Sequence, residues 1–109
     1  MRLIVARCSV SYTGRLSTEL PAAVRLLMIK ADGAFMVWGD GGGPSVKPLN
    51  WMTPPTVIEE SGETIVVRKR AAASTDRLEI RLAEVLSDVT HAMDPPAEET
   101  ALTKDGVEA

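Results

Sequence analysis

The residues best suited by type and spacing to bind a ligand lie in one short segment, Lys47–Pro55. Trp51 directly follows Asn50, and Lys47 lies four positions before the tryptophan. An indole can stack on a nucleobase for about 1–3 kcal/mol, an amide can pair with a base edge, and an ammonium group binds phosphate. The three prolines of the segment restrict the backbone. We therefore predict that Trp51 is held outward as a stacking platform for nucleic acid.

Two other interpretations of this segment are compatible with the residues. In one of them the chain is a β-domain that only associates with other proteins, with Trp51 in the core or at an interface and Asn50 as a turn residue. In the other, the same stacking platform binds single-stranded DNA or RNA, because stacking does not by itself discriminate between ligands.

The remaining candidate groups predict no catalytic or metal site. His91 is the only histidine and stands beside an acidic run, which is typical of a surface residue. Cys8 lies in an apolar stretch, where a small buried thiol is expected. Gly41–Gly43 lacks the Lys-Ser/Thr of a phosphate-binding loop. Glu59 and Glu60 are adjacent, so in a strand they point to opposite faces.

Charge is distributed unevenly along the 109 residues, whose formal net charge is −3. Residues 1–82 carry 11 Lys and Arg against 8 Asp and Glu, whereas residues 83–109 carry one Lys against 7 acids. A mildly basic body permits a polyanionic partner, although a solvated mixed surface gives similar numbers.

Length, cysteine content and hydropathy place the chain in a broad class. The length suits one domain, and 45% apolar with 25% charged residues is typical of a soluble globular protein. No apolar stretch is long enough to span a membrane, and Arg7 interrupts the amino-terminal apolar run that a secretory signal would need. A single cysteine makes no internal disulfide, so we expect a cytoplasmic protein.

The elements that would position these residues are β-strands. Asp32-Gly33 and the run 60–63 predict two hairpin turns. Leu78, Ile80 and Leu82 alternate with charged residues, which predicts a strand with one buried and one solvent-exposed face.

The first strand is apolar on both faces and is therefore central or at an interface. Ile4, Ala6, Cys8 and Val10 lie on one of these faces. Leu20, Ala23, Val24, Leu27 and Met28 also fit helical spacing, so a short helical turn near residues 17–23 is an alternative there. We predict a mainly β fold, an antiparallel half-open barrel or sandwich of six to seven strands, with room for one short helix.

The carboxy-terminal residues differ in character from the rest. Residues 94–99 form a polar, proline-containing run that indicates a linker, and Lys104–Ala109 resembles the opening of another element. We therefore expect a β-domain over residues 1–90, a linker over 91–109, and a fragment cut at a domain boundary.

Several motifs resemble those of a known family. They are Lys47-Pro-Leu-Asn-Trp-Met-x-Pro-Pro55, Arg2-Leu-Ile-Val-Ala-Arg-Cys8, Tyr12-x-Gly-Arg-Leu16, Leu27-Met-Ile-Lys-Ala-Asp-Gly33 and Lys104-Asp-Gly-Val-Glu-Ala109. Together they resemble the amino-terminal part of NucS, also called EndoMS, the mismatch-specific endonuclease family. The resemblance runs along the whole chain.

The resemblance implies a fold and a function. It implies a DNA-binding and dimerisation domain with a half-open β-barrel, whose homodimer clasps mismatched duplex DNA, flips the bases out and cuts both strands. It also implies that hydrolysis, with magnesium or manganese, belongs to a RecB-like nuclease domain outside this sequence. Branched or single-stranded DNA are further candidate ligands, and a sliding clamp is a candidate partner through absent regions.

The resemblance also assigns roles to particular residues. Trp51 is expected to stack on the flipped base and Asn50 to line its pocket, while Lys47 and neighbouring basic residues meet phosphates. The basic candidates that we select are Arg15, Arg25 and Lys30. In the denser run Arg68-Lys69-Arg70, Lys69 points away from the other two if the run is a strand.

The sequence departs from the family pattern at two places. Trp38 stands where a histidine is expected in many relatives, and it is a candidate for stacking or for a buried or dimer-interface position. The loop at residues 40–46 is rich in glycine and lacks a basic residue before Lys47, so phosphate contacts from this loop are not predicted.

Overall fold

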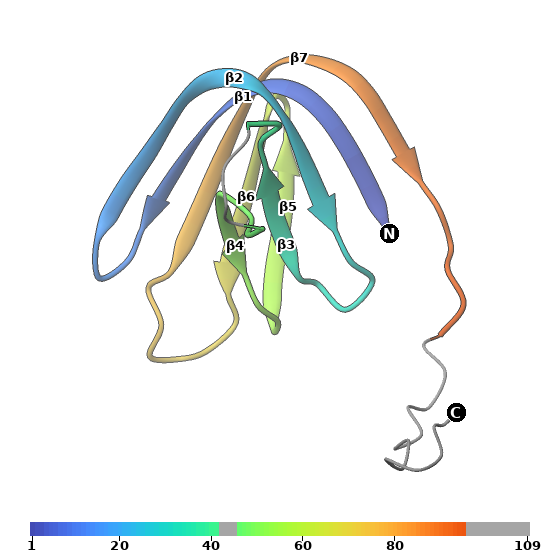
Figure 1. Ribbon diagram of the computed structural model, residues 1–109. Helices are drawn as coiled ribbons and strands as arrows, with labels where there is room; N and C mark the ends of the chain where they lie inside the picture. Colours follow the sequence, from blue (N-terminus) through green and yellow to red (C-terminus); the bar gives the residue numbers. More distant parts are fainter. Residues whose placement is uncertain (42–45, 96–109) are drawn as a thin grey trace, which may run out of the picture.

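The computed structural model describes residues 1–41 and 46–95. The described residues form one antiparallel sheet of seven strands (Figure 1). The strands are β1 (Arg2–Thr13), β2 (Ser17–Ile29), β3 (Phe35–Trp38), β4 (Asn50–Met52), β5 (Thr56–Ser61), β6 (Thr64–Lys69) and β7 (Arg77–Thr90). The predicted mainly β fold with six to seven antiparallel strands is confirmed.

The sheet curls into a half-barrel because its two edges are neighbours in the sequence. The strand order is β4-β3-β2-β1-β7-β6-β5, so β4 and β5 are the edge strands, yet only residues 53–55 separate them. The long strands β1, β2 and β7 arch over the shorter ones (Figure 1). Register shifts between Cys8 and Val10 and between Val5 and Ala6 mark irregularities in this arch, and such bulges bend strands.

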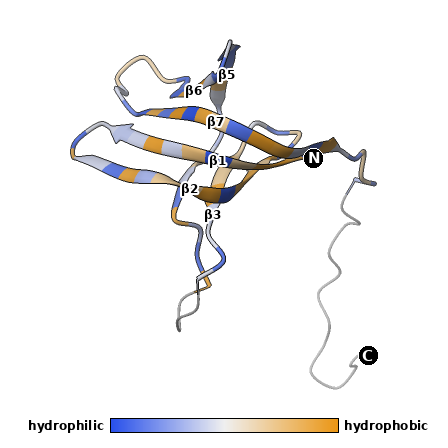
Figure 2. Ribbon diagram, turned by 90° about the horizontal axis from the view of Figure 1, so that it is seen from above, coloured by the Kyte–Doolittle hydropathy of each residue, from blue (hydrophilic) through white to orange (hydrophobic). Residues whose placement is uncertain are grey.

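Alternation of side chains builds the core on the inner face of the curled sheet. Ile4, Ala6, Cys8 and Val10 of β1 are all buried, as their spacing predicted. The same core takes side chains from β2, β3, β4, β6 and β7: Leu27, Phe35, Val37, Met52, Ile65, Val67, Leu78 and Ile80. Apolar and polar residues accordingly alternate along the long strands (Figure 2).

Both predicted hairpin turns are present. Gly33 has a φ of 97° and donates its N–H to the Lys30 carbonyl at 3.0 Å, which closes the turn between β2 and β3. Gly62 has a φ of 61° between β5 and β6. Only glycine adopts such angles at little cost, so these two positions set where the chain reverses.

The helical turn over residues 17–23 is not formed, and this interpretation was wrong. The segment belongs to β2, where Thr18 pairs with Tyr12 and Leu20 with Val10 of β1. Pro21, which has no N–H to donate, lies at the register shift between these pairs and Ala23. The long β1 backbone supplies partners that outweigh the local helical spacing.

The start of β1 is tied to two other strands by one guanidinium group. Arg2 donates to Asp88 of β7 from Nε at 3.0 Å and from Nη2 at 2.8 Å, and it also pairs with Glu60 of β5. These pairs connect the central strand to an edge strand across the curl.

The ion pair predicts a pH dependence of stability. Hydrogen bonds from Arg2 lower the pKa of Asp88 below its ordinary value of 3.8, so its stabilising contribution is present above that value and lost as the pH falls through the lowered pKa. Because both side chains are partly exposed, we expect Asp88→Asn to lower the free energy of unfolding at pH 7 by only ~0.5–1 kcal/mol. Urea unfolding from pH 7 down to about pH 2 measures this difference, which should vanish at the acid end. Asp94→Asn, at an exposed position, is the control, and a pH-independent difference would contradict the assignment.

The last strand of the sheet ends close to the last of the described residues. β7 ends at Thr90, and the His91 N–H donates to the Met1 carbonyl at 2.8 Å. His91 itself is exposed. Most of the predicted linker and the Lys104–Ala109 motif lie outside the described residues. Among those that are described, no helix has the length and apolar character needed to cross a membrane.

Candidate nucleic-acid interface

Trp51 is turned outward by its place in the short edge strand β4. This strand pairs with β3, with Trp51 opposite Met36 and Met52 opposite Phe35. Met52 points into the core with 5% of its surface exposed, so the adjacent side chain in the strand, that of Trp51, must point to the opposite face. Trp51 is 50% exposed. The interpretation of Trp51 as a core aromatic is therefore wrong, and the predicted outward orientation is confirmed.

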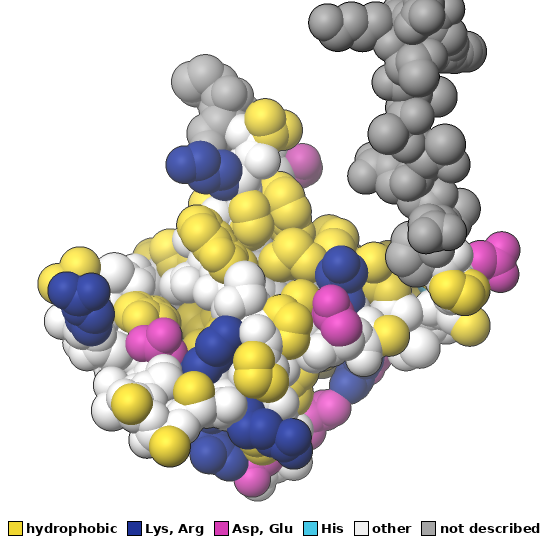
Figure 3. Space-filling view, turned by 90° about the horizontal axis from the view of Figure 1, so that it is seen from below, with side chains coloured by type: hydrophobic (Ala, Val, Ile, Leu, Met, Phe, Trp, Pro, Cys, Tyr) yellow, Lys and Arg dark blue, Asp and Glu magenta, His cyan; other side chains and the backbone are white. Residues whose placement is uncertain are grey.

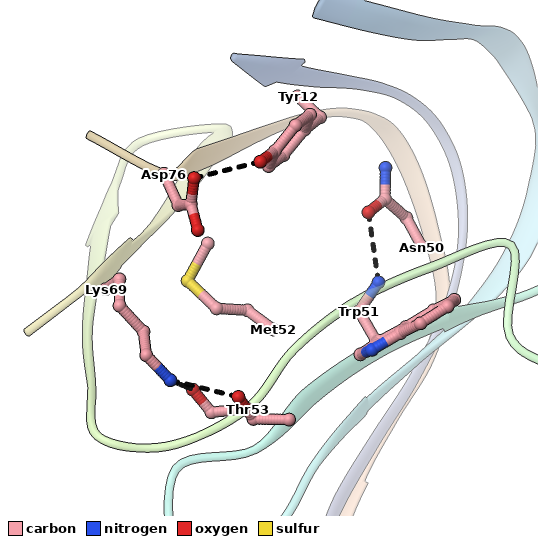
Figure 4. A pocket seen from close by; sticks show the side chains of 7 residues that line it. All are labelled: Tyr12, Asn50, Trp51, Met52, Thr53, Lys69 and Asp76. Carbon is pink, nitrogen blue, oxygen red and sulfur yellow. Dashed lines mark hydrogen bonds between the residues drawn. The ribbon is translucent and has the colours of Figure 1, made fainter. Parts of the chain in front are cut away.

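A cavity of about 330 Å³ lies against this tryptophan (Figure 4). Its lining comes from the edge strand β4 and the residue after it, from the ends of β1 and β6, and from the residue before β7: Tyr12, Asn50, Trp51, Met52, Thr53, Lys69 and Asp76. The volume is at the low end of the range for ligand pockets. The cavity therefore suits one small planar group rather than an extended ligand.

The polar groups of the cavity include both hydrogen-bond donors and acceptors. Asn50 Oδ1 accepts the Trp51 N–H at 3.0 Å, so the Asn50 amide nitrogen is left to donate. Tyr12 donates its hydroxyl to Asp76 Oδ1 at 2.9 Å, and this bond raises the pKa of Tyr12. The second carboxylate oxygen of Asp76 remains an acceptor. This arrangement can pair with the mixed donor and acceptor edge of a nucleobase that stacks on Trp51.

A second hollow of about 280 Å³ borders Trp51. Lys30, Met36 and Pro48 contribute to its lining together with core residues. The structure thus brings three of the predicted site residues, Lys30, Asn50 and Trp51, to one region at the β4 edge.

The other predicted basic residues are placed differently. Arg15 is exposed in the turn between β1 and β2, and its positive charge interacts electrostatically with the hydroxyl of Tyr12, which lines the cavity. Lys47 is exposed shortly before β4. Arg25 is only 8% exposed and donates from Nη1 to the Cys8 carbonyl at 2.7 Å, so its guanidinium is engaged by the sheet. We therefore leave Arg25 out of the phosphate contacts proposed below.

Trp38 is not among the residues that line the cavity at Trp51. It pairs with Leu26 of β2 and lines a hollow of about 260 Å³ beside Arg25. Its Nε1 is buried and has no hydrogen-bond partner among the described residues. Trp38 therefore contributes no stacking surface to the cavity at Trp51.

Sequence reasoning assigned no role to Tyr12 or Asp76 of the lining, and it considered Lys69 only as a candidate phosphate contact in the basic run 68–70. Tyr12, Lys69 and Asp76 are far from residues 47–55 in the sequence, and only the curl of the sheet brings them together. Tyr12 occurs in one of the family-like motifs, which was the one available signal, but the motif says nothing of its partner. Across residues 1–41 and 46–95, no group of three His, Cys, Asp or Glu side chains is placed to hold a metal ion.

The face seen from below in Figure 3 mixes apolar and basic side chains. Lys and Arg side chains stand among hydrophobic ones there, interspersed with acidic groups. Such a surface can contact both stacked bases and phosphates. Fold and site together define a curled β-domain with a solvent-facing aromatic residue and a small polar cavity at its edge.

The chain belongs to the NucS endonuclease family. The sequence model described as the endonuclease NucS N-terminal PH-like domain matches residues 1–98. Endonuclease NucS of Micrococcus luteus is 49% identical over the whole of this chain, and that of Frankia alni is 51% identical. The chain spans 49% and 46% of the length of these two relatives, so about half of each has no counterpart here.

Solved structures agree with this membership. A repair endonuclease from Pyrococcus abyssi superposes with a TM-score of 0.79 and 30% identity, over 90% of this chain and 41% of its own. An EndoMS–dsDNA complex superposes with a TM-score of 0.75 and 34% identity, over 94% of this chain and 41% of its own. The half-barrel is therefore a shared feature of these proteins.

Proposed function

We propose that this chain is the DNA-binding and dimerisation part of a cytoplasmic, mismatch-specific DNA endonuclease. The observation that carries the proposal is the half-exposed Trp51 beside a base-sized polar cavity. The similarity to a protein solved with dsDNA supports duplex DNA as the ligand.

Selectivity for mismatches follows from the energy of base flipping. Extruding a nucleotide from a duplex costs a few kcal/mol, and it costs least where the pair is already mismatched. Stacking on Trp51 returns about 1–3 kcal/mol, and Asn50 lines the cavity that receives the base. This return is comparable to the cost for a mismatched base and smaller than the cost for a sound pair, so mismatched duplex is bound preferentially.

Phosphate contacts supply the part of the affinity that does not depend on sequence. Lys47, Lys30 and Arg15 are the exposed candidates around the cavity. Their contribution should fall as salt rises, because binding releases counterions from the DNA.

A fluorescence titration tests the proposal. We expect the 109-residue chain to bind a mismatched duplex more tightly than the matched duplex or either single strand, with both duplex affinities falling between low and high salt. Equal affinity for matched and mismatched duplex would overturn the mismatch assignment. Tighter binding to single strands would favour a single-strand module, and no salt-dependent binding would favour a protein-association domain.

We propose that two copies of the chain dimerise through the outer face of their long strands. The exposed Val24 lies opposite Arg7 of β1, and the exposed Val89 opposite Leu3. Neither partner belongs to the buried set of β1, so both valines lie on the face turned away from the core. Exposed apolar side chains gathered on a sheet face are typical of an association surface.

A charge on this face should break the dimer. Introducing Val24→Asp and Val89→Asp together places two carboxylates in the apolar contact, and we expect analytical ultracentrifugation to report a monomer. Leu16→Asp, in the turn between β1 and β2 and 74% exposed, should leave the dimer intact. A dimer that survives the double change would refute this choice of interface.

The activity of the whole protein belongs to the same proposal. Cleavage of both strands, with magnesium or manganese, is assigned to a nuclease domain beyond this sequence, and a sliding clamp is proposed as a partner of such regions. The β-domain would supply recognition, and the nuclease domain the hydrolysis.

A further inference from the structure

One ammonium group holds the segment that follows Trp51. Lys69, at the end of β6, donates from Nζ to the Thr53 carbonyl at 2.6 Å, to Thr53 Oγ1 at 2.9 Å and to the Pro54 carbonyl at 2.9 Å. Figure 4 shows its side chain extended toward Thr53. Its sequence neighbours Arg68 and Arg70 are exposed.

These contacts use the whole hydrogen-bonding capacity of the side chain. An ammonium group has three donors and no acceptor, and all three are directed at the segment between β4 and β5. Hydrogen bonds from a charged donor are roughly twice as strong as neutral ones. Lys69 therefore has no donor left for a phosphate oxygen.

The backbone of the same residue reaches the opposite wall of the cavity. The Lys69 N–H donates to the Asp76 carbonyl at 3.2 Å, and Lys69 also pairs with Thr56 of β5. Asp76 in turn accepts the hydroxyl of Tyr12. One residue thus links the Trp51 side of the cavity to its Asp76 side.

We propose that Lys69 is a positioning residue, which sets the width of the cavity between Trp51 and Asp76 and makes no contact with DNA phosphate. The inference rests on the proposed function of this cavity as the site for an everted base. It separates Lys69 from the basic run in which it stands, because the arginines on either side are exposed, Arg70 without an ion pair among the described residues and Arg68 in an exposed pair with Glu59.

The test replaces Lys69 by methionine, which keeps the length and removes the donors. We expect Lys69→Met to lower the affinity for mismatched duplex about tenfold, to leave the affinity for matched duplex within about twofold, and to leave the slope of log affinity against log salt unchanged. Arg68→Met is the matched control, because Arg68 is the residue before Lys69 and the change removes the same charge from an exposed side chain. We expect it to preserve the preference for the mismatch.

A spectroscopic readout isolates the position of the indole. The chain has two tryptophans, so in a Trp38→Phe background the emission comes from Trp51 alone. We expect Lys69→Met to shift the Trp51 emission maximum and to raise its quenching by acrylamide. Arg68→Met in the same background should change neither.

The alternatives give different results. A salt slope lowered by about one, with matched and mismatched duplex weakened equally, means a phosphate contact and overturns the inference. An unchanged preference for the mismatch overturns it as well. If Lys69→Met does not fold, Thr53→Val decides, because it removes one of the three acceptors and should reduce the mismatch preference severalfold; no reduction overturns the inference.

Failure of this inference is distinguishable from failure of the proposed function. If Trp51→Ala lowers mismatch affinity while Lys69→Met does not, only the role of Lys69 is wrong. If Trp51→Ala has no effect either, the cavity is not the base site and the proposed function fails with the inference.

Discussion

Replacing Trp51 by alanine should lower the affinity for mismatched duplex by about fivefold to more than a hundredfold, while the β-domain stays folded. The range corresponds to the ~1–3 kcal/mol that stacking of one base on an aromatic side chain provides. The fold should survive because the indole is 50% exposed and its neighbour Met52 fills the core position. A gel-shift or fluorescence titration measures the affinity, and circular dichroism monitors the fold.

Leu49→Ala is the matched control for this change. Leu49 is also 50% exposed and lies two residues before Trp51 in the same segment. The Leu49→Ala substitution removes apolar surface without removing a stacking plane, so the affinity for mismatched duplex should change by less than about twofold. An equal loss for both variants, or no loss for Trp51→Ala, would show that the indole does not receive a base.

The largest effect on stability is expected for Phe35→Ala. Phe35 is fully buried at the start of β3 and pairs with Met52, so it lies in the strand adjacent to the one that carries Trp51. Truncating a buried phenylalanine removes apolar contacts and leaves a cavity, which costs about 3–5 kcal/mol. Because single domains are stable by only about 5–15 kcal/mol, a large part of the folding free energy is lost. Equilibrium unfolding in urea measures the change.

An exposed leucine provides the comparison for the core variant. Leu16 is 74% exposed in the turn between β1 and β2, so Leu16→Ala should change the free energy of unfolding by no more than about 0.5 kcal/mol. A loss below about 1 kcal/mol for Phe35→Ala would mean that the core collapses around the gap or that Phe35 is not the centre of the packing.

Local features of the fold were predictable from the sequence because they depend on near neighbours. The positive φ at Gly33 and Gly62 is a property of glycine in tight turns. The buried alternation from Ile4 to Val10 follows from the period of two in a strand. Residues 17–23 were misjudged because their helical spacing is local, whereas their pairing with β1 is not.

The site was predictable only where it is contiguous in the chain. Asn50 and Trp51 stand out by their types, and the prolines around them indicate a stiff backbone. The engaged guanidinium of Arg25 could not be foreseen, because its acceptor is the carbonyl of Cys8, seventeen residues earlier.

By itself the sequence determined the family and the β character, since each depends on residue types at short separations, whereas the outward orientation of Trp51 was decided by its place in β4. The tertiary structure alone decided the cavity. Tyr12, Lys69 and Asp76 reach Trp51 only because β4 and β5, the two edges of the sheet, are tied together by residues 53–55. The physical reason is that a curl accumulates over all seven strands, so no local pattern records which distant side chains it brings together.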